Sequence, residues 1–290
     1  MAVRSPLPFA AACLGIAIFT GMDAVMKHLS LAIGSYNAML WRTLISVPML
    51  LPLFLLRRGR LPARPVLILH VARALSLATS MLFFFWGLAR LPMALGVALS
   101  FIAPLLALGM AAYFLKEQVA RSALGASLLA FGGMLVILAG QPKGAAGAAD
   151  WLASAAILIA ATLYAVGVVI GRSLAQRAGP LEIATILNIV ASSYFLIGAP
   201  WLGIIPASVH WPFLLGAAVS ANISMMLLSW AYARAEAQHL LPVEYTAFLW
   251  ASLFGWLVFG EVVTAATLTG AALIVIACLW AARGGRRAAS

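Results

Sequence analysis

Long apolar stretches separated by short polar breaks run along almost the whole chain. A transmembrane helix needs about 20 consecutive, mostly apolar residues, and ten stretches meet that requirement. They cover residues 8–31, 34–56, 66–89, 92–115, 119–140, 151–174, 181–205, 211–235, 239–260 and 263–283. The pattern therefore predicts an all-α bundle of ten transmembrane helices, with no sizeable soluble domain.

Composition supports this interpretation. Hydrophobic residues make up 65% of the 290 positions and charged residues only 9%, whereas a soluble domain has roughly 45–50% and about 25%. A soluble enzyme, a disordered chain and a nucleic-acid-binding protein are therefore excluded, and the expected partner is the lipid bilayer. The first apolar run reaches Asp23 and Lys27, which favours a retained first span over a cleaved signal peptide.

The positive charges indicate how the bundle is oriented. There are 18 Lys and Arg residues against 7 Asp and Glu, a formal net charge of +11, and cytoplasmic loops carry an excess of Lys and Arg. With a cytoplasmic N-terminus, only Lys27, Arg90 and Lys143 fall on the outer side, while Arg42 and Arg73 lie within spans. All the others are on the inner side. We therefore expect both termini in the cytoplasm and the protein in the cell inner (plasma) membrane.

Two motifs of the first half recur in the second half at an offset of 144 residues. They are Trp86-Gly-Leu-Ala-Arg90 with Trp230-Ala-Tyr-Ala-Arg234, and Phe114-Leu-Lys-Glu117 with Val258-Phe-Gly-Glu261. Lys27-His-Leu-Ser likewise matches Arg172-Ser-Leu at an offset of 145. Tryptophan, arginine and glutamate at one constant offset indicate an internal duplication.

The duplication divides the chain into a five-helix repeat at 1–140, a linker at 141–150 and a second five-helix repeat at 151–290. Because five is odd, the second repeat must enter the membrane upside down. Inverted repeats are typical of secondary transporters, which bind substrate between the repeats and work by alternating access. A channel is disfavoured because the inverted repeat supplies a natural two-state mechanism.

Ten spans in two repeats, with Glu117 and Glu261 each closing a fourth span and each followed by a small-residue helix, resemble the drug/metabolite transporter superfamily. More narrowly, the chain is similar to EamA-type exporters, above all to those that export aromatic amino acids. The resemblance implies a basket-shaped bundle with a central cavity. It also implies that the first, third, fourth, sixth, eighth and ninth helices line that cavity, whereas the fifth and tenth are peripheral.

Ionisable residues inside a span are costly and therefore candidates for function. Asp23 and Lys27 lie four residues apart, hence on one helix face. They can meet an amino acid's ammonium and carboxylate, or form a structural ion pair. Arg42 and Arg73 suit a carboxylate, unless they satisfy partners within the packed bundle. Glu244 is the candidate for proton coupling, unless it forms an ion pair or faces water.

Aromatic, methionine and small polar residues on the implied cavity helices complete the candidate binding site. Such walls accept large apolar groups, although lipid contact and interhelical hydrogen bonds are the alternatives. The candidates are Met22, Ser80, Met81, Phe84, Phe101, Tyr164, Asn222, Met226, Trp230 and Tyr245. Three prolines that remove helix hydrogen bonds are candidate gating kinks or static bends: Pro48, Pro52 and Pro104.

The leading hypothesis is export by alternating access of amino acids such as Phe, Trp, Tyr, Met and Thr, and of related metabolites, by a monomer. A multidrug exporter of lipophilic cations is the first alternative, and it would depend on an acid such as Asp23 or Glu244. An intramembrane enzyme is disfavoured, because the sequence has no Gly-x-Ser-x-Gly and no His-Glu-x-x-His motif. Cys13 and Cys278 lack metal-ligand spacing, so neither a metal nor a cofactor is expected.

Overall fold

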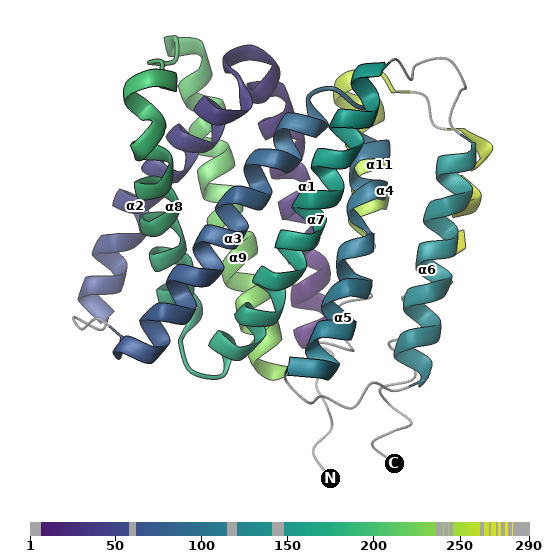
Figure 1. The fold of residues 1–290 in the computed structure, drawn as a ribbon, viewed down its shortest axis with the longest axis horizontal. Coiled ribbons are helices and arrows are strands. Elements are labelled where there is room, and N and C mark those ends of the chain that lie inside the picture. The colour runs from purple at the N-terminus through teal and green to yellow at the C-terminus, as the bar shows by residue number, and fades with distance from the viewer. Residues whose placement is uncertain are drawn as a thin grey trace.

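The computed structural model describes residues 7–57, 62–114, 121–140, 148–235 and 246–261, together with 240, 243, 264–266, 268–270, 272–273, 276–277 and 280. Every regular element in these ranges is helical (Figure 1), which confirms the all-α prediction. The helices are α1 Leu7–Ile33, α2 Ser35–Arg57, α3 Arg64–Leu88, α4 Met93–Ser100, α5 Ile102–Phe114, α6 Arg121–Ala139, α7 Ala148–Ala175, α8 Pro180–Leu202, the 3-10 helix η1 Ser208–His210, α9 Trp211–Arg234 and α11 Ala247–Phe259.

Seven of these segments are long and apolar enough to cross a membrane, with α4 and α5 counted together as Met93–Phe114. Shorter apolar helices at Leu124–Gly133 and Ala247–Phe259 fall within the predicted fifth and ninth spans. The predicted tenth span, 263–283, lies largely outside the described residues. The chain is thus a multi-pass membrane protein.

Helix ends fall where glycine and proline dictate them. Gly34 adopts φ +80, a left-handed conformation that suits glycine, and it alone separates α1 from α2. α8 follows Gly179 and begins at Pro180, whose missing N–H is not needed in a first turn. The chain therefore reverses direction within very few residues at both points.

The predicted fourth span is broken into α4 and α5 at Phe101. Pro104 has no N–H to donate to the carbonyl of Ser100, so the α-helical pattern is interrupted there. The N–H of Phe101 instead donates to the carbonyl of Ala98 at 3.1 Å, a tighter turn. By contrast, α2 continues through Pro48 and Pro52. Whether these prolines act in gating stays a prediction.

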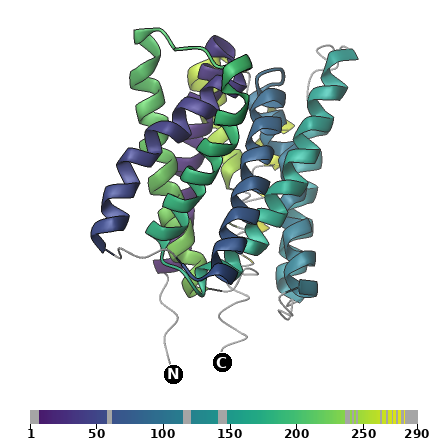
Figure 2. The same ribbon diagram turned by 60° about the vertical axis from the view of Figure 1, so that its left-hand side comes forward.

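The two halves of the chain interdigitate rather than pack as separate bundles. α1 packs along α9, α3 along α7 and α2 along α8, while α11 contacts α1 and α4. Figures 1 and 2 show the bundle from two directions, and Figure 1 shows α6 at its edge. Each of the three principal helix pairs therefore joins one helix from each half.

The duplicated Trp/Arg motif has the same local geometry in both halves. The guanidinium carbon of Arg90 lies 3.9 Å from the Trp86 ring centroid, and that of Arg234 lies 4.2 Å from the Trp230 ring centroid. Each arginine also donates to the carbonyl of its own tryptophan, at 2.7 and 3.2 Å. The motifs end α3 and α9, which run in opposite directions (Figure 1), as two inverted five-helix repeats require.

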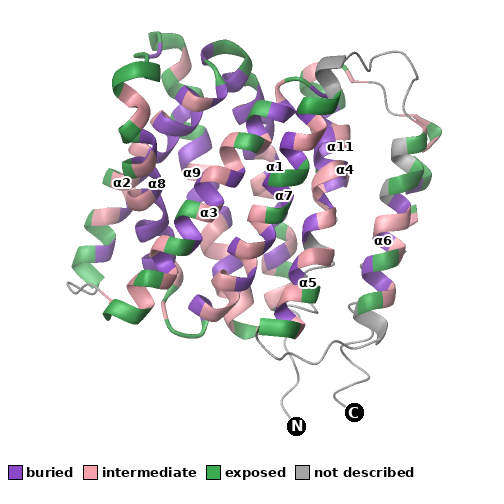
Figure 3. Cartoon of the chain, viewed as in Figure 1, coloured by how far each residue is buried: buried purple, intermediate pink, exposed green. Residues whose placement is uncertain are grey.

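Buried positions gather on the inward faces of the helices, and exposed positions lie around the outside (Figure 3). Many of the exposed side chains are large and apolar, among them Leu56, Trp201 and Ile205. A soluble monomer rarely exposes so extensive an apolar surface, but in a bilayer this surface contacts lipid tails.

Close packing of α3 against α7 depends on Gly87. A Cβ added there would lie 2.7 Å from both the Ala153 carbonyl oxygen and Ile157 Cγ1. Because the carbonyl is backbone, the helices would have to shift, so we expect Gly87→Ala to lower the free energy of unfolding by about 1–3 kcal/mol. Thermal unfolding in detergent micelles would measure this. Gly216→Ala on α9 is the matched control, since nothing lies within 4 Å of the added Cβ; equal losses in both variants would contradict the prediction.

Candidate functional site

A central cavity of about 100 Å³ lies where α1, α2, α3, α4, α5, α7 and α11 converge. Its wall is mostly apolar and aromatic, with a few polar side chains. The lining residues are Ile16, Phe19, Met22, Asp23, Arg42, Ser80, Met81, Phe84, Phe85, Val97, Ser100, Phe101, Ala103, Ala160, Ala161, Tyr164 and Ala247. Eight of the candidate residues named from the sequence meet here: Met22, Asp23, Arg42, Ser80, Met81, Phe84, Phe101 and Tyr164.

The break between α4 and α5 lies on the wall of this cavity, because both Ser100 and Phe101 line it. Irregular backbone at membrane depth is tolerated where it lines a cavity, and discontinuous helices form binding sites in transporters. The Ser100 hydroxyl turns back to the Val97 carbonyl at 2.7 Å. The broken helix therefore shapes the central cavity.

Asp23 and Arg42 bring groups of opposite charge to the wall of the central cavity. Both are 4% exposed. Among the described residues, none donates a hydrogen bond to Asp23 Oδ1 and none accepts one from Arg42 Nε. Arg42 Nη2 has a weak acceptor, the Met81 sulfur at 3.4 Å. Buried polar atoms without partners are costly, and a group that supplies both a donor and an acceptor would satisfy both atoms.

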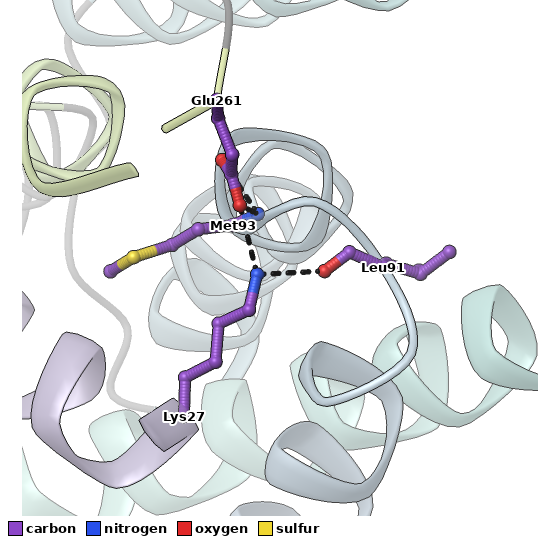
Figure 4. Close-up of polar contacts among 4 residues, drawn as sticks. All are labelled: Lys27, Leu91, Met93 and Glu261. Carbon is purple, nitrogen blue, oxygen red and sulfur yellow. Dashed lines mark hydrogen bonds and ion pairs between the residues drawn. The ribbon is translucent and has the colours of Figure 1, made fainter. Parts of the chain in front are cut away.

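Lys27 belongs to a different group of residues, which we call the upper cluster: Lys27, Leu91, Met93 and Glu261 (Figure 4). Lys27 Nζ lies 2.9 Å from Glu261 Oε1 and donates to the Leu91 carbonyl at 3.0 Å. The N–H of Met93 donates to both carboxylate oxygens of Glu261, at 2.9 and 3.1 Å. The ion pair of Lys27 is thus with Glu261, although its spacing from Asp23 had suggested a pair on α1.

Local structure explains why Glu261 reaches this position. Gly260 ends α11 in the left-handed conformation, with φ +65, and the N–H of Glu261 donates to the Gly255 carbonyl at 3.1 Å. This is the usual glycine-based helix ending. The carboxylate then meets the first residue of α4, where a negative charge is favoured by the helix dipole. The upper cluster therefore ties together α1, the turn before α4 and the end of α11.

Two further predicted residues, Met226 and Trp230, line a wider cleft of about 800 Å³. This lower cleft lies between the starts of α1 and α8 and the second halves of α2 and α9, and Arg57 and Glu182 also line it. His70 Nε2 lies 3.3 Å from Glu182 Oε1, and both residues are 3% exposed. Sequence reasoning missed this pair, because 112 residues separate its members and no motif links them.

Arg73 lies outside the lining of the central cavity and joins three helices. Its Nε donates to the Gly167 carbonyl at 3.2 Å, and its Nη2 contacts the Met225 sulfur at 3.4 Å. A Cβ added at Gly171 would lie 2.7 Å from Arg73 Nε, so a glycine there makes room for the guanidinium. This geometry corresponds to the packing role considered for Arg73 from the sequence.

The other predicted site residues lie elsewhere or are not described. Asn222 lines a side pocket of about 20 Å³ that shares Phe19, Arg42 and Met81 with the central cavity. α9, the eighth predicted span, thus lines the side pocket and the lower cleft. Tyr245 and Glu244 lie outside the described residues, as does the side chain of Pro104, so proton coupling at Glu244 stays a prediction.

Comparison with known proteins identifies transporters as relatives. The chain is 24% identical over 266 residues to the pseudopaline exporter CntI of Pseudomonas aeruginosa, covering 90% of each chain. It is 28% identical over 225 residues to the riboflavin transporter of Vibrio cholerae, covering 75% of this chain and 74% of that one. It is also 24% identical over 262 residues to the S-adenosylmethionine uptake transporter of Rickettsia prowazekii, covering 89% and 86%.

The fold and both halves of the sequence match known proteins. A crystal structure of 19% sequence identity superposes with a TM-score of 0.77 over 97% of this chain and 99% of the other, which shows a shared fold. The sequence profile of the EamA-like transporter family matches twice, at residues 7–139 and 151–283. These two matches span nearly the whole chain, which therefore belongs to the EamA-like transporter family and is a multi-pass membrane transporter.

Proposed function

We propose that this protein exports amino acids, aromatic ones among them, and related metabolites across the cell inner membrane. The observation that carries the proposal is the central cavity, where a buried carboxylate and a buried guanidinium face an apolar and aromatic wall. A zwitterionic amino acid matches this arrangement. Its ammonium suits Asp23, its carboxylate suits Arg42, and its side chain suits the phenylalanine and methionine walls.

Orientation and mechanism follow from the two repeats. With the positive-inside distribution of Lys and Arg, the end of the bundle where α1 begins faces the cytoplasm, and the upper cluster faces outward. Substrate would enter from the lower side, bind in the central cavity, and leave when the repeats at 1–140 and 151–290 rock against each other. One chain contains the whole cavity, which supports a functional monomer.

The cavity also discriminates against the multidrug alternative. Arg42 lines the same small space as Asp23, and its Nε has no hydrogen-bond partner among the described residues. A lipophilic cation that pairs with Asp23 would therefore lie beside the positive charge of Arg42 and bring no anion for it. Such like-charge contact is unfavourable in a low-dielectric site. A substrate that carries its own carboxylate is therefore preferred.

Transport by purified protein in proteoliposomes would test the proposal. We expect saturable flux of phenylalanine, tryptophan, methionine or threonine, and little flux of a lipophilic cation such as tetraphenylphosphonium. Repeating the assay with and without a pH gradient would show whether transport is proton-driven. Cation flux without amino-acid flux would establish the multidrug alternative, and vesicles without protein provide the baseline.

A further inference from the structure

The side pocket next to the central cavity contains two hydrogen-bond donors that have no acceptor. Arg42 and Asn222 both line it, and they are 4% and 5% exposed. Arg42 Nε and Asn222 Nδ2 are buried, and neither has a hydrogen-bond partner in the part of the chain that the structure describes. Leaving two buried donors unsatisfied at one spot costs free energy, so this part of the protein suits a ligand that brings acceptor oxygens.

The orientation of the Asn222 amide is fixed by its neighbour on α8. Asn188 Nδ2 donates to the Ala184 carbonyl at 2.9 Å, which identifies that atom as the nitrogen. The same nitrogen donates to Asn222 at 3.1 Å, so the Asn222 atom on that side is the carbonyl oxygen. The NH₂ group of Asn222 is therefore the end without a partner among the described residues. Asn222 thus contributes a hydrogen-bond donor, and not an acceptor, to the side pocket.

Two other polar residues line the pocket, Thr43 and Asn188. The Asn188 NH₂ group already donates to Ala184 and Asn222, as described above. The Thr43 hydroxyl lies 2.9 and 3.0 Å from the carbonyls of Met39 and Leu40, within its own helix. The volume of about 20 Å³ corresponds to little more than one water-sized atom. A single oxygen of a larger ligand fits this space, with the rest of that ligand in the central cavity.

We propose that the side pocket is a carboxylate subsite, in which Asn222 and Arg42 bind one oxygen of the substrate's carboxylate while the side chain occupies the central cavity. This inference rests on the proposed function and makes it more specific: the substrate class is α-amino acids with a free carboxylate. Asn222 is then a specificity-determining residue. Its NH₂ group donates a hydrogen bond to a carboxylate oxygen, which an amine lacks and which an ester replaces with an uncharged oxygen.

Asn222→Leu, which removes the donor at similar volume, tests the subsite. We compare phenylalanine with phenethylamine, its analogue without the carboxylate, by binding in detergent and by flux in proteoliposomes. Loss of a hydrogen bond to a charged group predicts a Kd and a KM for phenylalanine raised about tenfold or more, with unchanged phenethylamine binding.

Asn222→Asp places a negative charge there and is expected to weaken phenylalanine binding further. Ser192→Ala is the control, since the Ser192 hydroxyl is also buried without a partner but lies outside both pockets.

The outcomes separate this inference from the proposed function. Phenylalanine transport that is unaffected by Asn222→Leu would overturn the subsite and leave amino-acid export standing. Absence of amino-acid flux in the wild type would overturn both. If Asn222→Leu does not fold, Asn222→Asp decides: weaker phenylalanine binding with undiminished phenethylamine binding supports the subsite, and unchanged binding of both excludes it.

Discussion

Replacement of Arg42 by methionine is expected to impair saturable amino-acid transport strongly, lowering kcat/KM by about tenfold to a hundredfold. The guanidinium is the positive charge on the wall of the central cavity, and a charge-assisted hydrogen bond to a carboxylate contributes about 1.5–3 kcal/mol, of which each 1.4 kcal/mol is roughly tenfold. Initial rates of phenylalanine uptake in proteoliposomes, over a range of concentrations, would measure the loss.

Two companion variants make this result interpretable. Arg177→Met removes an exposed arginine from the turn after α7, and it should transport as the wild type does. The double variant Asp23→Asn/Arg42→Met removes both buried charges, so it avoids the penalty of an uncompensated buried carboxylate, about 3–5 kcal/mol. It should be more stable than Arg42→Met yet equally impaired in transport. Wild-type kinetics in either Arg42 variant would show that the cavity binds substrate without this charge.

The second large effect is expected at the upper cluster, from Glu261→Gln. Lys27 is 6% exposed, and its ammonium would lose its anionic partner while the start of α4 would lose a capping charge. Breaking a buried ion pair on one side costs about 3–5 kcal/mol, and since the Glu261 side chain is 21% exposed we expect about 2–3 kcal/mol. Thermal unfolding of the purified protein would record this as a lower Tm.

A double variant and an exposed control complete the test of the upper cluster. Lys27→Met/Glu261→Gln removes both charges, so it should recover part of the stability that Glu261→Gln loses. Arg90→Gln removes an exposed arginine that follows the end of α3, close in sequence to Leu91 of the upper cluster. This variant should change the Tm little. If all three variants unfold at the wild-type temperature, the contacts of Lys27 and Glu261 do not stabilise the bundle.

The architecture was predictable because the bilayer leaves few options. Apolar length defines the spans, and the constant offset of the Trp86 and Trp230 motifs indicates the repeat from the sequence alone. The position of the α4–α5 break also follows from Pro104, since proline removes a helix hydrogen bond wherever it falls inside a helix. These features depend on the residue types within one segment or motif, which can be read from the sequence.

The contacts inside the bundle were harder to predict, because they depend on how each helix is rotated about its axis. Spacing placed Asp23 and Lys27 on one face, but it could not tell that Lys27 meets Glu261, 234 residues away. The same limit applies to Glu182 and His70, which come from different halves. Among Phe83, Phe84 and Phe85, neighbours on one helix, Phe84 and Phe85 line the cavity, whereas Phe83 is exposed.

The pairing of α1 with α9, α3 with α7 and α2 with α8 has a consequence for how the protein is made. When the ribosome has completed only the first half, α1, α2 and α3 are in the bilayer, but none of their principal partners has been synthesised. Their inward faces, with the charges of Asp23 and Arg42, must be shielded until α7, α8 and α9 arrive. A chain truncated after residue 140 would leave these inward faces without their packing partners, and we expect it not to function as half a transporter. Two separately expressed halves could assemble only if each inserted with its own orientation.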